Sequence, residues 1–246
     1  MSSASVHEPV FAVAAQQTLR RMDVALHAAL SERGLEVVPI PVVADATLYN
    51  EELKKFCCLC DEEFVQQRIE EMAIMDVFGG EAVGPKGQLG MPASLGFILR
   101  DATSLENAAV IVVNKKEAHP ALFFQKSNMQ LPTEDADKYA LIHVLCVEQS
   151  FEAELPRSKQ QGSSGRGEGT LALVYALWYI TSQFGWHRSF LIVGNPTKNA
   201  RAVKFYDVMG YSRINGDAGR RMHVNHLALL EESLDSIRLR ASKVTN

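Results

Sequence analysis

Hydrophobic and polar positions follow two different periods along the chain, and each change of period marks a predicted element. Residues Glu8 to Arg33 place apolar side chains at helical spacing and are followed at once by Gly34, which predicts a helix with a glycine stop. Leu35 to Val43 is apolar and β-branched but contains Pro39 and Pro41. Proline cannot donate to a strand ladder, so this segment fits an edge strand.

The middle of the chain predicts helices first and strands afterwards. Asn50 to Met75 returns to helical spacing, and the glycine-dense stretch from Gly79 to Gly90 indicates a loop. Three short apolar runs separated by polar residues then predict an antiparallel meander: Ser94 to Leu99, Ala108 to Val113 and Ala121 to Gln125. Tyr139 to Val147 is longer and more fully apolar, which is typical of a central strand.

The last third alternates helices and strands. In order, we predict an apolar helix from about Thr170 to Phe184, a strand at Ser189 to Val193, an amphipathic helix at Asn199 to Met209, a strand at Met222 to Leu230, and a terminal helix at Glu231 to Lys243. A meander followed by strand, helix, strand, helix and strand predicts a mixed-sheet α/β (α+β) fold. We expect residues 1–34 to be a helical extension and residues 35–246 to be one domain.

Composition narrows the class of protein. The chain has 246 residues, of which 22% are charged and 47% hydrophobic, as is usual for a globular protein. The net charge of −4 gives no long-range attraction for nucleic acid or anionic lipid. No uncharged apolar run reaches the roughly 18 to 20 residues that span a bilayer, and the first residues lack a secretory pattern. We therefore expect a cytoplasmic protein with no membrane or nucleic-acid partner.

Neither the cysteines nor the histidines have the spacing of a metal site. The four cysteines form neither a disulfide framework nor two separated zinc-binding pairs: Cys57, Cys58, Cys60 and Cys146. His223 and His226 are three residues apart, and in the predicted strand they project to opposite faces. We expect no metal.

A glycine-rich turn links the predicted central strand to the apolar helix. Gly165, Gly167 and Gly169, with Arg166 among them, stand where a helix N-terminus can hold a phosphate group through its backbone amides. A flexible serine and glycine linker explains the same residues about equally well. The spacing matches neither a dinucleotide-binding loop nor a P-loop.

The segment beyond this turn makes the pattern more specific. The predicted amphipathic helix in this segment carries Asn199, Ala202, Phe205 and Tyr206. Gly210-Tyr211 follows that helix. Together with Leu145-Cys146-Val147 and the loop from Ser164 to Gly169, this order resembles the GNAT superfamily of N-acetyltransferases over about residues 140 to 212. Two features depart from the family pattern: Ser164 replaces the usual Arg or Gln, and residues Glu152 to Ser163 are inserted.

The resemblance implies a GNAT-type mixed, mostly antiparallel sheet flanked by helices. It implies acetyl-CoA as the acetyl donor, coenzyme A as the product, and direct attack by an amine in a ternary complex. The coenzyme-binding residues that it implies are Leu145, Cys146, Val147, Arg166, Gly167, Glu168, Gly169, Thr170 and Asn199. Within the superfamily, the sequences from Ala140 to Val147 and from Pro92 to Phe97 resemble the arylalkylamine branch.

Two residues are candidate catalysts. An alkylamine with a pKa of roughly 10 is protonated at neutral pH, so a base such as His143 must accept its proton. That branch has a histidine pair on this strand, and Leu141 replaces the first member here. Strand alternation places Leu141, His143 and Leu145 on one face and their neighbours on the other. The alternative is a histidine that only packs in the core.

Tyr206 is the candidate acid that protonates the departing thiolate, because a phenol and a thiol have similar acidities. Packing on an amphipathic helix is the alternative for this tyrosine. Cys146 is a less suitable nucleophile, since the resemblance implies direct transfer.

Three functions stay open on these residues. The first is transfer of an acetyl group to a small primary amine, with an arylalkylamine-like acceptor favoured. The second is a catalytically silent acyl-CoA-binding sensor or scaffold, which Ser164 and the insertion favour. The third is a protein (lysine or N-terminal) acetyltransferase.

Overall fold

The computed structural model describes seven parts of the chain: residues 7–40, 94–116, 139–147, 167–193, 197, 200–213 and 221–241. Its strands are β1 (Leu35–Ile40), β2 (Ser94–Asp101), β3 (Asn107–Lys116), β4 (Tyr139–Val147), β5 (Arg188–Ile192), β6 (Ser212–Arg213) and β7 (Arg221–Asn225). Its helices are α1 (His7–Glu32), α6 (Glu168–Phe184), α7 (Ala200–Val208) and α8 (His226–Ala241). We keep these labels below.

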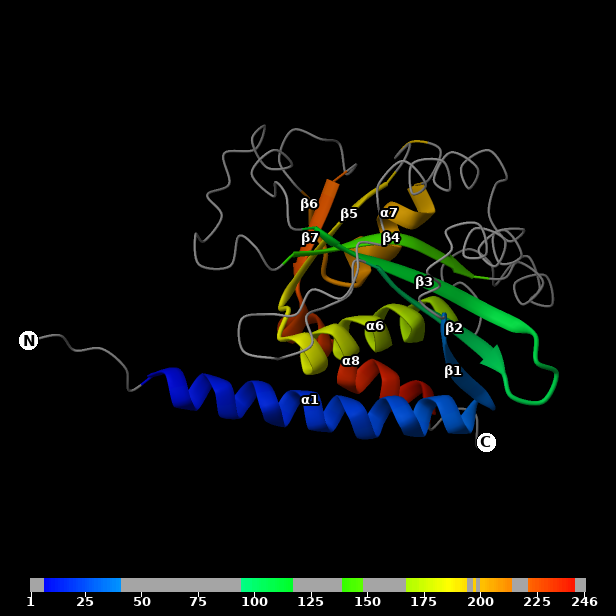
Figure 1. Ribbon diagram of the computed structural model, residues 1–246, viewed down its shortest axis with the longest axis horizontal. Coiled ribbons are helices and arrows are strands. Elements are labelled where there is room, and N and C mark those ends of the chain that lie inside the picture. Colours follow the sequence, from blue (N-terminus) through cyan, green and yellow to red (C-terminus); the bar gives the residue numbers. More distant parts are fainter. Residues whose placement is uncertain are drawn as a thin grey trace, which may run out of the picture.

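The strands form one seven-stranded sheet in the order β1-β2-β3-β4-β5-β7-β6. Each neighbouring pair is antiparallel except β4 and β5, which are parallel and are connected through α6. The sheet is therefore mixed and mostly antiparallel and is flanked by helices, which confirms the predicted fold class (Figure 1). β4 is the middle strand of the order, as its apolar sequence predicted.

Helix α6 is buried because apolar side chains cover most of its circumference. Its fully buried members include Leu171, Leu173 and Leu177. The helix ends at Gly185, where φ is 67°, and the amide of that glycine donates to Thr181 O at 3.1 Å. A left-handed residue in this position is the usual glycine stop.

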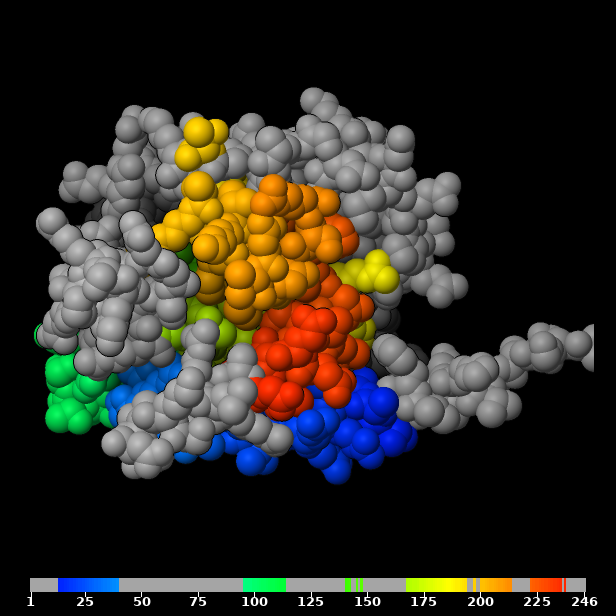
Figure 2. Space-filling view, turned by 180° about the vertical axis from the view of Figure 1, so that it is seen from behind, coloured from blue at the N-terminus to red at the C-terminus, as the bar shows by residue number. Residues whose placement is uncertain are grey.

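Helices α1 and α8 lie with α6 on one face of the sheet (Figure 1). Met22, Leu26 and Ala29 of α1 are each 0% exposed and belong to the same core as α6 and the sheet. Thr18 Oγ1 of α1 donates to Glu231 Oε2 of α8 at 3.1 Å. Viewed from behind, α7 in orange borders α8 in red, with α1 in blue beneath them (Figure 2). Helix α1 is thus packed into the core.

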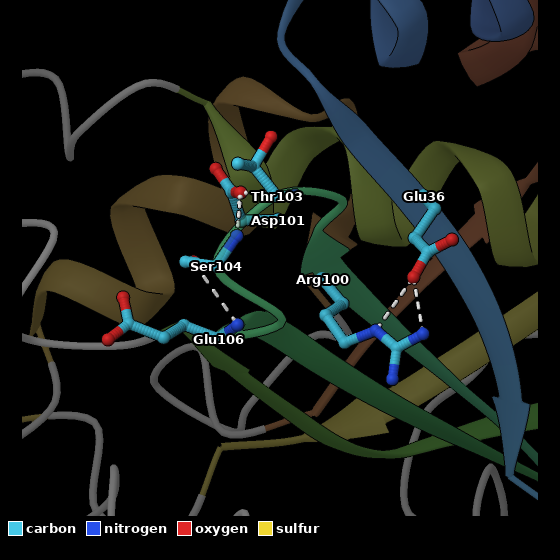
Figure 3. Close-up of polar contacts among 6 residues, drawn as sticks. All are labelled: Glu36, Arg100, Asp101, Thr103, Ser104 and Glu106. Atoms are coloured by element: carbon cyan, nitrogen blue, oxygen red, sulfur yellow. Dashed lines mark hydrogen bonds and ion pairs between the residues drawn. The ribbon is translucent and has the colours of Figure 1, made fainter.

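Polar contacts hold the β1 edge and the β2–β3 turn (Figure 3). The Arg100 guanidinium of β2 donates from Nε and an Nη to Glu36 Oε1 of β1, and the two residues are partners in the strand register. Asp101 Oδ1 accepts the amides of Thr103 and Ser104, each at 2.8 Å. This Asx-type turn fixes the hairpin that pairs β2 with β3.

One predicted boundary is wrong. The sequence predicted a strand from Met222 to Leu230, but β7 ends at Asn225 and α8 begins at the next residue. The Asn225 side chain accepts the amides of Leu227 at 3.0 Å and Ala228 at 3.4 Å, which caps the helix. His223 and His226 therefore belong to different elements, and their predicted projection from opposite faces of one strand does not apply.

Several predictions concern parts of the chain outside the described residues. They are the helical segment 50–75, the glycine loop 79–90, the third meander run 121–125, and Cys57, Cys58 and Cys60. Within the described part, no helix is long and apolar enough to span a bilayer.

Candidate functional site

Strands β4 and β5 pair along only part of their length. The residues paired between the two strands run from Tyr139 with Arg188 to Ile142 with Leu191. Beyond Ile142, β4 continues for five residues to Val147 with no pairing to β5 among the described residues. Figure 1 shows the two strands leaving in different directions at this end. Within the described sheet, the half of β4 from His143 to Val147 is therefore not paired with β5.

The same point of β4 also carries a break in its pairing with β3. Val113 pairs with Ile142, whereas the preceding Val112 pairs with Val144, so His143 is the residue that the register skips. This is the pattern of a β-bulge, in which one strand has an extra, unpaired residue. Within the described sheet, the backbone at His143 therefore has a Cα partner on neither side.

The bulge overturns the predicted alternation of faces. Leu145 and Val147 pack against the same core cluster that contains Ile142. A regular strand would place Ile142 on the face opposite Leu145, as the sequence predicted. The extra residue at position 143 shifts the alternation by one, so the predicted grouping of Leu141 with Leu145 on one face is wrong.

The N-terminus of α6 starts without a side-chain cap. Gly167 precedes the helix with φ 86° and ψ 21°, a left-handed conformation that favours glycine. The first turn closes with the Leu171 amide donating to Gly167 O at 3.0 Å. The amides of Gly169 and Thr170 come earlier in this turn and have no acceptor within the helix. Such amides, with the helix dipole, suit an anion.

Gly169 brings three of the predicted segments together. A Cβ built on this residue would lie 3.0 Å from Val147 Cγ2 of β4 and 3.9 Å from the Phe205 ring of α7. A side chain at position 169 would therefore displace the end of β4. The C-terminal end of β4, the start of α6 and the predicted Phe205-Tyr206 pair of α7 meet at one place.

Tyr206 is held in a row of aromatic rings. Its ring centroid lies 5.1 Å from Phe205 and 5.3 Å from Tyr211, both edge to face. The side chain is 9% exposed, and burial raises the pKa of Tyr206 well above its ordinary value. The phenol consequently stays protonated, and it remains a hydrogen-bond donor across the physiological pH range.

The remaining predicted residues divide into described and undescribed groups. Leu145, Val147 and Thr170 are half-buried, and Glu168 is 2% exposed. The side chains of His143 and Cys146, and all of Arg166 and Asn199, lie outside the described residues. Reasoning from sequence missed the bulge at His143, since nothing in an apolar strand sequence marks an extra residue.

Sequence reasoning also missed Ser189. This serine stands in the apolar strand β5, is 0% exposed, and shares a hydrogen bond of 2.9 Å with the Tyr211 hydroxyl. The signal in the sequence is a lone hydroxyl residue at the start of an otherwise apolar run. Among the described residues, no group of three or more potential metal ligands is found.

Comparisons with known proteins gave structural neighbours only. No protein-family model matches the sequence, and no curated protein sequence does. A structure of AtaTR bound with AcCoA is 14% identical, with a TM-score of 0.44, covering 84% of this chain and 97% of the other. The spermidine/spermine N-acetyltransferase SpeG from Vibrio cholerae, in mutant forms, is 15% identical with a TM-score of 0.40, covering 81% and 98%.

A third neighbour is the KacTA-DNA complex, 12% identical with a TM-score of 0.42, covering 81% of this chain and 99% of that one. Identities and TM-scores of this size assign neither a family nor an activity.

Proposed function

We propose that the protein is an acetyl-CoA-dependent N-acetyltransferase of the GNAT superfamily. The observation that carries the proposal is the meeting of β4, α6 and α7 around Gly169, which joins Val147 to Phe205. The three segments that resemble the family in sequence are thereby neighbours in space. A sequence pattern that arose from unrelated linkers and packing positions has no reason to converge in this way.

In this proposal the coenzyme diphosphate binds at the start of α6. Gly167 allows close backbone approach, and the amides of Gly169 and Thr170 donate to the phosphate oxygens. Glu168 takes part through its backbone, because its carboxylate is buried. Arg166 and Asn199 contribute on the resemblance alone, the latter beside the pantetheine arm.

The pantetheine arm then runs along β4 where the pairing with β5 has ended. Leu145, Cys146 and Val147 offer backbone groups there, as β5 does to the first half of the strand. At the bulge, His143 has no Cα partner in the described sheet, so its backbone amide is suited to polarise the thioester carbonyl.

The transfer step is direct. The nitrogen of a neutral amine attacks the acetyl carbonyl carbon, a C–N bond forms, and the C–S bond breaks. His143 accepts the amine proton, directly or through water. Tyr206 donates a hydrogen bond to the departing thiolate. Because burial raises the phenol pKa, while an ordinary thiol has a pKa of about 8.5, we propose that this bond stabilises the thiolate without complete proton transfer.

We favour a small arylalkylamine-like acceptor, on the resemblance of the β2 and β4 sequences to that branch. The competing function is a silent acyl-CoA-binding protein. One observation favours it: the Glu168 carboxylate is buried in the first turn of α6, where it competes with a phosphate for the same helix dipole.

Calorimetry with acetyl-CoA on two matched glycine variants tests the binding site. Gly167 and Gly185 flank the same helix with φ of 86° and 67°, so a valine strains the backbone at both. We expect Gly167→Val to weaken acetyl-CoA binding by about tenfold or more, a change of about 1.4 kcal/mol. Gly185→Val should leave the affinity close to that of the parent. Equal affinities in both folded variants would remove the α6 N-terminus from the site.

A further inference from the structure

The position of the Tyr206 ring depends on Tyr211. The two ring centroids are 5.3 Å apart at an interplanar angle of 66°. The Tyr211 amide also donates to Tyr206 O at 2.9 Å, which closes the end of α7. Among the described residues no hydrogen bond to the Tyr206 hydroxyl is found, so the orientation of this ring is set by its packing neighbours.

Tyr211 is itself fixed to the sheet. It is 3% exposed, and its hydroxyl shares a hydrogen bond of 2.9 Å with Ser189 Oγ. Ser189 is fully buried in β5, the strand that diverges from β4 beside the proposed coenzyme site. A buried hydroxyl that loses its partner keeps its full desolvation cost, so the pair favours one arrangement of the two side chains.

The position of Ser189 in β5 links its contact with Tyr211 to strand β4. Ser189 pairs in register with Ala140 of β4, three residues before the bulge at His143. A side chain on β5 thus holds the ring that packs against Tyr206, while the backbone of the same residue is paired to β4. The contact ties the orientation of the proposed thiolate donor to the strand that carries the proposed base.

We propose that Ser189 and Tyr211 are positioning residues that hold Tyr206 in the orientation needed for acetyl transfer. The inference rests on the proposed function, in which the Tyr206 hydroxyl meets the leaving sulfur. Neither Ser189 nor Tyr211 is proposed to touch substrate. They act through the Tyr206 ring.

Rate measurements on hydroxyl deletions test the proposal. Ser189→Ala and Tyr211→Phe each keep the shape of the side chain and remove one partner of the hydrogen bond. We expect each to lower kcat by about 10-fold to 10²-fold, as small displacements of a catalytic group do, with acetyl-CoA affinity unchanged. The double variant should be no slower than the slower single one, because both remove the same hydrogen bond.

The decisive background is Tyr206→Phe. If the pair acts through the Tyr206 hydroxyl, Ser189→Ala should change kcat less than twofold once that hydroxyl is absent. An undiminished loss in this background would overturn the proposal, because it would show that the pair supports the fold as a whole. Tyr179→Phe is the matched control, since this half-buried tyrosine packs in a separate ring cluster with Phe97 and Tyr175. Its kcat should equal that of the parent.

A measurement without turnover separates this inference from the proposed function. In protein labelled with [ζ-¹³C]tyrosine, the Tyr206 signal is assigned by its loss in Tyr206→Phe. We expect Ser189→Ala to shift or broaden that signal, and Tyr179→Phe to leave it in place. An unmoved Tyr206 signal in folded Ser189→Ala overturns the positioning role, whether or not the parent transfers acetyl groups. Lack of acetyl transfer by the parent, with the signal moved, instead overturns the proposed function.

Discussion

At the scale of single residues, burial and hydrogen bonding decide what each candidate can do. Tyr206 is buried in a row of aromatic rings and keeps its proton. The hydroxyl of the neighbouring Tyr211, in contrast, is hydrogen-bonded to Ser189. Of these two tyrosines, Tyr206 is therefore the one whose hydroxyl can serve a ligand.

Replacing Tyr206 with Phe should lower kcat by about 10²-fold to 10⁴-fold, the usual loss for a positioned acid or hydrogen-bond donor. The change removes one hydroxyl from a packed ring, so acetyl-CoA affinity and the urea midpoint should change little. Steady-state thiol release and calorimetry measure the two effects. A variant as fast as its parent in single-turnover experiments would reduce Tyr206 to a packing residue.

The pH profile tests His143. A base must be neutral to accept a proton, so activity should rise with pH as the His143 imidazole becomes neutral. The rising limb should disappear in His143→Gln, which cannot titrate. Rates would be followed with a saturating amine over about 1.5 pH units either side of neutrality. If the folded variant keeps both the parent rate and the parent profile, His143 is a packing residue.

At the scale of elements, the site depends on how closely α6 approaches the end of β4. A methyl at position 169 would lie 3.0 Å from Val147 Cγ2, tighter than ordinary contact. In the parent we expect Gly169→Ala to lower the free energy of unfolding by about 1–3 kcal/mol through overpacking.

In a protein that already carries Val147→Ala, we expect Gly169→Ala to have a different effect on stability. Removing the Val147 methyl groups frees the space, and alanine is favoured over glycine in a helix by about 1 kcal/mol. Gly169→Ala should then be neutral or stabilising in urea titrations of the double variant. An equal cost in both backgrounds would show that the two residues do not compete for space.

Much of the arrangement of helices and strands along the chain was predictable from sequence, and the predictions that failed did so for physical reasons. Periodicity and glycine stops located α1, α6 and α7, and a fully apolar run located β4, because burial imposes those patterns. The bulge at His143 was not predictable, since a two-residue alternation contains no mark of an extra residue. The end of β7 was missed because the Asn225 cap lies inside an apolar run that continues into α8.

Convergence of the site was predictable only by resemblance. The order of the segments implied that residues near 147, 169 and 206 serve one ligand, which stays a prediction, and the structure places Gly169 beside Val147 and Phe205. The positioning contact between Ser189 and Tyr211 was not predictable. Ser189 lies on β5 and Tyr211 lies beyond α7, 22 residues later, so no local sequence pattern relates the two.

At the scale of the whole molecule, one buried histidine joins α8 to α6 and to the turn that follows α6. His226, at the start of α8, is 0% exposed, and its Nδ1 lies 2.9 Å from both Trp186 O and Thr181 Oγ1. Since a carbonyl only accepts, Nδ1 carries the proton. Nε2 is buried with no hydrogen-bond partner in the described part of the chain. Burial lowers the pKa of His226 to about 3.

This histidine should make the fold sensitive to mild acid. Its folded pKa of about 3 lies below an unfolded value of about 6.5, so the unfolded chain binds the extra proton between them. The contribution to stability is complete above pH 6.5 and is lost as the pH falls, by at most about 1.4 kcal/mol per pH unit. His226→Asn keeps a donor for Trp186 O but cannot titrate.

Urea midpoints between pH 7 and 5, a window chosen above the usual carboxylate pKa values of about 4, measure this effect. The parent should lose stability across the window, and His226→Asn should lose less. His27→Asn is the control, because His27 is 69% exposed, and its curve should follow the parent. Identical slopes for parent and His226→Asn would assign the acid sensitivity to other groups.

We propose that the junction of β4, α6 and α7 transfers an acetyl group from acetyl-CoA to an amine. The most direct measurement is release of the coenzyme A thiol by the full chain over a panel of arylalkylamines, polyamines and lysine peptides, with the acetylated amine quantified by mass spectrometry. We predict thiol and acetylated amine in equal amounts with at least one small amine, and loss of both in Tyr206→Phe. Tight acetyl-CoA binding without thiol release on any acceptor would contradict the claim and leave a silent acyl-CoA-binding protein.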